Sequence, residues 1–285
     1  MTLGRIRRRV CPSTKRHRRL SAFLLVVLTF CLANQQTAGA QQQGAATGAN
    51  DSLTTAQVIE KLVEMNFRRA QALHSYSGTR VYRVEYRNPL GSTSAGMVVD
   101  VNYRAPGTKE FVIRSSTGST LILDRVFKKL LQAEKDALSI DGLRRTALNG
   151  ENYEFAMVGF ECTAARRMYV LTVDPKTKSK FLFRGRIWVD ADDFAVVRLD
   201  AEPAKNPSFW TKSSQIEQSY EKVDDFWLPQ RNHSVSSIRI GGRAELTIEY
   251  QSYNIKASER ISTEPAQQVA RSSVATLPKT ENGHQ

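Results

Sequence analysis

The chain has 285 residues, and its 41 Lys and Arg against 28 Asp and Glu give a formal net charge of +13. A charge of this size would suggest nucleic acid as a partner, but eight of the basic residues and none of the acidic ones lie within residues 1–40. The remaining 33 basic residues exceed the acidic ones by about five and are scattered along expected strands, which is typical of a solvated sheet face. We therefore expect no nucleic-acid partner.

The N-terminal segment has the pattern of a secretory signal peptide. Its basic start precedes an apolar run from Leu20 to Leu32, which is too short for the ~20 residues of a spanning helix. Ala38-Gly39-Ala40 supplies the small-residue pattern for cleavage after Ala40, so we expect a periplasmic protein. An uncleaved membrane anchor is the alternative.

Two other export routes fit less well. A lipid attached at Cys31 would require a small residue where bulky Phe30 stands, and the residues after the pair Arg18-Arg19 lack the hydrophobic pattern of a twin-arginine signal.

The first expected elements are a flexible leader and one helix. Residues 41–53 form the leader, and the capping box of Thr54 and Gln57, with Leu53 and Val58 as a hydrophobic staple, starts a helix over 54–73. Helical spacing predicts a buried stripe of Ile59, Leu62, Val63, Asn66, Ala70 and Leu73.

Alternating residues then predict three strands, interrupted by a helical segment. The first two lie near 81–86 and 97–103, and the third starts at Phe111. Between Thr120 and Leu148 the period becomes helical, with a stripe of Leu123, Val126, Phe127, Leu130 and Leu131. Ser139 caps a shorter second helix that ends at Asn149-Gly150.

Seven more strands are expected before a disordered tail at 256–285. Their runs are near 152–160, 167–173, 181–190, 194–202, 214–223, 227–238 and 243–255. The clearest pair is a hairpin within 181–210, in which Phe183 and Ile187 share one strand face, Trp188 lies on the other, and Asp190-Ala191-Asp192-Asp193 makes the turn.

These elements predict an α+β fold in one domain over residues 54–255. About ten antiparallel strands form a single curled sheet, an incomplete β-barrel, with an N-terminal helix and a helical plug or lid inserted after the third strand. The apolar sides of the helices would be buried against the concave face.

No catalytic, metal-binding or cofactor site is predicted, so we do not expect an enzyme. The histidines His74, His233 and His284 are far apart, Gly-x-Ser-x-Gly is absent, and the acidic residues of 190–193 are explained by turn chemistry. Cys162, the only cysteine after residue 40, cannot form an intramolecular disulfide, and we expect it to be small, buried and inert.

Four segments resemble the LolA/LolB-like group of outer-membrane lipoprotein-sorting proteins, over about residues 54–255. They are Tyr169-Val-Leu-Thr-Val-Asp-Pro-Lys176, Gly185-Arg-Ile-Trp-Val-Asp190, Phe226-Trp-Leu-Pro229 and Leu246-Thr-Ile-Glu-Tyr250. The resemblance implies a half-barrel with a helical lid that binds or carries lipoproteins or another acylated ligand in the periplasm. The implied partners are the acyl chain of a lipoprotein or lipid, and an inner- or outer-membrane protein. The segment Asn206 to Trp210 departs from that pattern.

The resemblance also implies an apolar ligand cavity in a protein that we expect to be monomeric. Its candidate lining residues are Phe127, Leu131, Phe183, Ile187, Trp188, Phe209, Trp210 and Trp227. Each could instead belong to a closed core, and Trp188 cannot share a cavity with Phe183 and Ile187 unless a bulge intervenes. The alternative functions are a non-enzymatic envelope sensor of the same fold that binds a regulatory membrane protein and, less favoured, a hydrolase.

Overall fold

The computed structural model describes residues 53–206, 208–209, 211–239 and 241–257. Helix α1 (Thr55–Ala72) leads into β1 (Leu73–Asn88), β2 (Gly91–Arg104) and β3 (Thr108–Gly118). A helical insert follows, made of α2 (Thr120–Ile122), the π-helical turn Leu123–Phe127, α3 (Lys128–Ala137) and α4 (Ile140–Thr146). The remaining strands are β4 (Tyr153–Cys162), β5 (Arg167–Pro175), β6 (Phe183–Asp190), β7 (Val196–Pro203), β8 (Thr211–Val223), β9 (Phe226–Ile238) and β10 (Arg243–Ala257).

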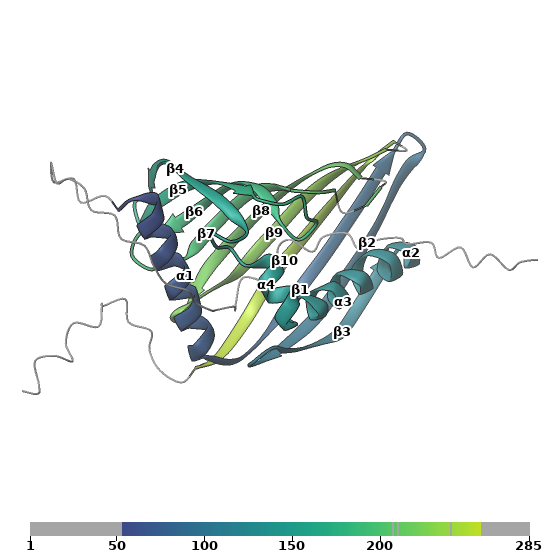
Figure 1. Cartoon of the computed structure of the whole chain (residues 1–285). Coiled ribbons are helices and arrows are strands. Elements are labelled where there is room, and N and C mark those ends of the chain that lie inside the picture. The colour runs from purple at the N-terminus through teal and green to yellow at the C-terminus, as the bar shows by residue number, and fades with distance from the viewer. Residues whose placement is uncertain (1–52, 207, 210, 240, 258–285) are drawn as a thin grey trace, which may run out of the picture.

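The ten strands form one antiparallel sheet in the order β3-β2-β1-β10-β9-β8-β7-β6-β5-β4. The edge strands β3 and β4 do not pair with each other, so the sheet is not closed. Figure 1 shows the sheet curled, with α1 and the insert lying across the same face, which we call the inner face; the opposite face is the outer face. The predicted fold class is confirmed. In the part of the chain that the structure describes, no helix has both the length and the apolar character needed to cross a membrane.

Helix α1 begins at the predicted capping box, and the stripe that it buries partly matches the predicted one. The Thr54 hydroxyl accepts from the Gln57 amide, and the Gln57 side chain accepts from the Thr54 amide. The buried positions are Val58, Leu62, Met65, Arg69 and Ala70, and Leu73 after the helix is buried too. Leu62, Ala70 and Leu73 of the predicted stripe are therefore confirmed, whereas Ile59, Val63 and Asn66 are half-buried. The difference arises at Arg69, whose guanidinium donates to the backbone carbonyls of Asp193 and Phe194. A prediction based on the spacing of apolar residues does not place an arginine on the buried side of a helix.

The insert is less regular than expected. A π-helical turn separates α2 from α3 where one long helix was predicted, and α4 ends at Thr146, before the predicted Asn149-Gly150. A π turn holds one more residue than an α turn, which adjusts the helix register. Phe127, Leu130 and Leu131 of the predicted stripe are nevertheless buried on the inner face.

The β6–β7 hairpin has the predicted turn. One Asp190 carboxylate oxygen accepts hydrogen bonds from the backbone amides of Asp192 (3.0 Å) and Asp193 (2.9 Å). Strand β6 starts at Phe183, two residues later than expected, and β3 starts at Thr108, three residues earlier, because Thr108 already pairs with Arg104. These strand boundaries correct the sequence-based ones.

Two of the apolar clusters of the inner face lie beneath the helical layers. Beneath α1, Val58 and Leu62 pack with residues of β5 to β8 such as Ile187 and Ile216. Beneath the insert, Phe127 packs with residues of β1, β2 and β10 such as Tyr82. The inner face of β8 and β9 carries buried polar side chains, namely Ser214, Gln218, Asn232, Ser234 and Ser236. Each helical layer therefore covers its own part of the sheet.

Candidate functional site

An apolar groove of about 430 Å³ lies between the insert and the strands β1, β2, β9 and β10. The insert contributes Leu121, Ile122, Val126 and Leu130 to one wall. The sheet contributes Val84, Tyr86, Thr93, Ser234, Ser236, Ile238, Ala244, Glu245 and Leu246, and Ser119 precedes α2. Its volume falls within the range of small-molecule sites, and its walls are mainly hydrocarbon. We call this feature the apolar groove.

Strand pairing explains the sheet wall. Val84 pairs with Leu246 and Tyr86 with Ala244 across β1 and β10, and side chains two residues apart on a strand share a face. On the insert side, Ile122 and Leu130 are buried, but Leu121 is 59% exposed. An exposed leucine at the rim of an apolar groove leaves hydrocarbon surface that a bound chain could cover.

The polar side of the groove belongs to β9. Ser234 and Ser236 line it, and Asn232 continues the same row. Asn232 donates from Nδ2 to Gln218 Oε1 at 3.0 Å, while its buried Oδ1 finds no hydrogen-bond partner among the described residues. The inner face thus offers hydroxyl groups and an unpaired acceptor beside the apolar walls.

A buried ionic cluster joins the insert to the sheet. Arg80 of β1 holds Glu134 of α3 through both guanidinium nitrogens, at 2.7 Å and 3.1 Å. Lys109 of β3 donates to the same carboxylate at 2.7 Å. The three side chains are only 3–6% exposed. We call this set, Arg80, Lys109 and Glu134, the charge cluster.

The charge cluster fixes the ionisation of its members. Burial alone would raise the pKa of Glu134, but the charges of Arg80 and Lys109 outweigh it and lower that pKa below its usual range. Burial alone would lower the pKa of Lys109, but the negative charge of Glu134 outweighs burial, and the pKa of Lys109 is raised. All three groups are therefore charged at neutral pH, and Glu134 is not suited to act as a general acid or base.

Aromatic rings lie beside both cations of the charge cluster. The Arg80 guanidinium lies 4.9 Å from the centre of the Tyr250 ring, and Lys109 Nζ lies 5.5 Å from that of Tyr76 and 5.7 Å from that of Tyr103. Two cations share one carboxylate, so the ring faces supply part of the stabilisation that water would otherwise give. This arrangement fits a structural joint better than a reactive site.

The structure distributes the eight predicted cavity residues over several places. Phe127 and Leu131 lie together beneath the insert, and Phe183 and Ile187 lie together beneath α1. Trp188 and Trp227 belong to a third cluster, in which Trp188 donates to Glu161 and Trp227 to Asp193. Phe209 is 76% exposed. Trp210 lies outside the described residues.

The opposite faces expected for Trp188 and for the pair Phe183 and Ile187 are confirmed, since they belong to different clusters. None of the eight residues lines the apolar groove, and contact of any of them with a ligand stays a prediction.

One sequence-based expectation is wrong, because Cys162 is exposed rather than buried. It ends the edge strand β4, where only β5 pairs with it. Among the residues that the structure describes, no group of three or more His, Cys, Asp or Glu side chains is placed to hold a metal ion.

Sequence reasoning missed the charge cluster and most of the groove. The sequence nevertheless contains a signal for the cluster. Arg80 lies at even spacing from buried Tyr82 and Val84 on β1, and Lys109 lies two residues before Phe111 on β3, so each cation shares a strand face with apolar residues. Glu134 follows Leu130 and Leu131 at helical spacing. Charged residues at inward-facing positions predict buried ion pairs, whereas the groove depends on how distant elements meet.

One family model matches part of the chain. Residues 143–254 match the model of a family of unknown function, DUF5686. No curated protein sequence matches significantly.

Three solved structures are similar in fold. A DUF1329 family protein from Desulfovibrio piger is 13% identical, with a TM-score of 0.38, over 72% of this chain and 94% of that one. A LolA superfamily protein from Nitrosomonas europaea is 12% identical, with a TM-score of 0.34, over 72% and 94%. A putative outer membrane lipoprotein-sorting protein domain from Vibrio parahaemolyticus is 12% identical, with a TM-score of 0.36, over 70% and 93%. Similarity this low carries no argument about function, which is argued below from the groove.

Proposed function

We propose that the protein is a non-enzymatic, exported binding or carrier protein for an acylated, hydrophobic ligand such as a lipoprotein or lipid. The observation that supports this proposal is the apolar groove between the insert and the sheet, with Leu121 and Leu246 on its two sides. Export is supported by the signal pattern within residues 1–40, which lie outside the described residues.

Hydrocarbon burial is sufficient to give useful affinity in such a groove. Each CH₂ group removed from water contributes about 0.8 kcal/mol, so an acyl segment of six to eight carbons would gain roughly 5–6 kcal/mol before the cost of ordering. The serines of β9 place hydrogen-bonding groups on one side, where a polar linkage of the ligand can lie. An amphipathic chain therefore matches the groove better than a purely apolar one.

The first experiment identifies the ligand. The protein is purified under native conditions from its cellular envelope, and bound lipids and acylated peptides are measured by mass spectrometry. We expect acyl species at close to one per protein molecule. Recovery of none, together with no binding of an added fluorescent fatty acid, would contradict the proposal.

The second experiment places the ligand in the groove. Leu121→Gln removes an apolar wall residue that is 59% exposed, whereas Ile140→Gln makes a matched change at a residue that is 87% exposed and lies outside the groove. Because Leu121 would be covered by the ligand, we expect about 5- to 10-fold weaker binding of a fluorescent fatty acid to Leu121→Gln. Ile140→Gln should bind like the wild type. Equal affinities in the three proteins would place the ligand elsewhere.

The second candidate function is binding of a segment of a regulatory membrane protein. It is favoured by the edge strand β3, which pairs only with β2 and exposes Val112 and Ile113. A peptide in extended conformation can add to such an edge. Chemical cross-linking in envelopes distinguishes the two functions: a protein cross-linked to β3 and lost in Ile113→Lys would support the second, and acyl species in the groove the first.

A further inference from the structure

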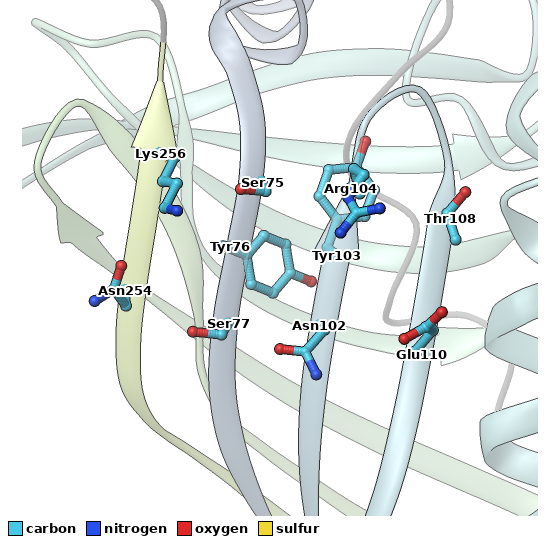
Figure 2. A pocket seen from close by; sticks show the side chains of 10 residues that line it. All are labelled: Ser75, Tyr76, Ser77, Asn102, Tyr103, Arg104, Thr108, Glu110, Asn254 and Lys256. Carbon is cyan, nitrogen blue, oxygen red and sulfur yellow. The ribbon is translucent and has the colours of Figure 1, made fainter.

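The outer face carries a hollow that the proposed function does not use. It has a volume of about 370 Å³ and lies over the ends of β10, β1, β2 and β3, where β1 begins and β10 ends. The residues that line it are Ser75, Tyr76, Ser77, Asn102, Tyr103, Arg104, Thr108, Glu110, Asn254 and Lys256. We call this hollow the polar cleft (Figure 2).

Strand pairing arranges eight of these side chains in two rows. Ser75 pairs with both Lys256 and Arg104, and Arg104 pairs with Thr108, which gives the row Lys256–Ser75–Arg104–Thr108. Ser77 pairs with both Asn254 and Asn102, and Asn102 pairs with Glu110, which gives the row Asn254–Ser77–Asn102–Glu110. Figure 2 shows the first row above the second. Every one of these eight side chains can form hydrogen bonds, and none is apolar.

The backbone explains why a hollow forms on this face. The pairing of β1 with β10 shifts register between Leu73 and Ser75 and again between Ser77 and Thr79, so an irregularity lies on each side of Ser75 and Ser77. In β10, Ser252 has a positive φ of 56°. Bulges bend a strand and increase its local twist, and they are common next to binding sites.

The first row has the chemistry of an oxyanion site. Neighbouring strands lie about 4.8 Å apart, so Lys256 and Arg104 start about 10 Å apart with the Ser75 hydroxyl between them. Their long side chains can converge on one anion held over Ser75, and a guanidinium binds phosphate or carboxylate through two hydrogen bonds. Within the described residues neither cation forms an ion pair, and Asp100, another carboxylate on this face, is paired with Arg114.

The second row has the chemistry of a polyol site. The two amide side chains of Asn254 and Asn102 and the Ser77 hydroxyl both donate and accept, and the Glu110 carboxylate accepts from hydroxyl groups. Glu110 would repel an anion placed beside it, so the anionic group belongs at the other row.

We propose that the polar cleft binds a phosphorylated polyol, with the phosphate between Arg104 and Lys256 over Ser75 and the hydroxyl groups along the row of Asn254, Ser77, Asn102 and Glu110. The same chemical group occurs in free sugar or glycerol phosphates and in the headgroup of phosphatidylglycerol. The cleft lies on the face opposite the apolar groove, so this site does not depend on the function proposed for the groove.

The test uses glycerol 3-phosphate, inorganic phosphate and glycerol as soluble probes, followed by NMR titration of the purified protein. We expect glycerol 3-phosphate to bind with a dissociation constant on the order of 0.1–1 mM, tighter than either inorganic phosphate or glycerol alone. Arg104→Gln and Lys256→Gln should each weaken it about 10-fold. The control Arg83→Gln changes a cation of the same outer face of β1 that is paired with Glu249 and does not line the cleft, and it should bind like the wild type.

Vesicles of phosphatidylglycerol, compared with phosphatidylcholine, distinguish the source of the group. Binding of either glycerol 3-phosphate or phosphatidylglycerol that is lost in Arg104→Gln supports the site and names its source. Two results would overturn the proposal: binding that Arg104→Gln and Lys256→Gln leave unchanged, or equal binding of inorganic phosphate and glycerol 3-phosphate. Arg104 and Lys256 are both exposed, so we expect the two variants to fold, and circular dichroism checks that they do.

Discussion

At the residue scale, the charge cluster places three ionised side chains on the buried inner face. A buried carboxylate holds two buried cations, so removing its charge leaves both without a counter-ion. Strand parity could have predicted Arg80 and Lys109 as inward-facing, but parity cannot identify Glu134 as their common partner. That pairing depends on where α3 crosses β1 and β3.

Replacement of Glu134 should therefore be costly. We expect Glu134→Gln to lower the free energy of unfolding by about 3–5 kcal/mol, because the buried guanidinium of Arg80 and the buried ammonium of Lys109 lose their counter-ion. Urea denaturation measures the change. The matched control is Glu64→Gln, which breaks an exposed ion pair with Arg68 and should cost less than about 1 kcal/mol. Similar costs for the two variants would contradict a central role for the cluster.

The charge cluster also predicts an acid dependence of stability. The pKa of Glu134 is lower in the folded chain than its ordinary value of 4.5, so its contribution is complete above about pH 4.5. The contribution is lost as the pH falls through the folded pKa, because the unfolded chain binds the proton first. Lys109 and Arg80, whose pKa values are raised, lose nothing in this range.

The measurable quantity is the difference in unfolding free energy between the wild type and Glu134→Gln. It should stay constant from pH 6 to about 4.5 and shrink as the pH is lowered further, and the other carboxylates, present in both proteins, cancel. A difference that stays constant well below pH 4.5 would count against the assignment.

At the element scale, the sequence predicted all ten strands because alternation is a strong signal wherever one sheet face is buried. The π turn at Leu123–Phe127 and the buried Arg69 of α1 were not predictable in this way. Both depend on side-chain packing against strands that are distant in sequence, and helical periodicity contains no information about that packing.

The β6–β7 pair provides a test at this scale. Gly185 has a φ of +156°, and a Cβ there would collide with the Asp200 carbonyl oxygen and with Ala201 on the paired strand. We expect Gly185→Ala to destabilise the protein by on the order of 1–3 kcal/mol, seen as a lower Tm in thermal denaturation. Gly150→Ala is the control, since its added Cβ would have no atom within 4 Å. An unchanged Tm for Gly185→Ala would show that the strands can separate without cost.

At the scale of the whole molecule, the sheet holds two helical layers, and one of them, the insert, borders the apolar groove. Val58 and Leu62 of α1 are fully buried against β5 to β8, whereas the insert borders the apolar groove and leaves Leu121 exposed. The sequence indicated a lid from its position after the third strand. It could not indicate the groove, because the groove walls come from segments near residues 84, 122, 234 and 246 that only the strand order brings together.

This difference predicts where a bound ligand should change the protein. Hydrogen-exchange mass spectrometry with and without ligand compares the amides of the insert, residues 120–137, with those of α1. A bound long-chain fatty acid covers Leu121 and completes the packing of the insert, so protection should rise over 120–137 and stay the same over 55–72. The rise should be smaller in Leu121→Gln at the same ligand concentration, since less of the protein is occupied. Protection that rises equally in both helical layers would instead indicate a ligand bound between them, over the polar inner face of β8 and β9.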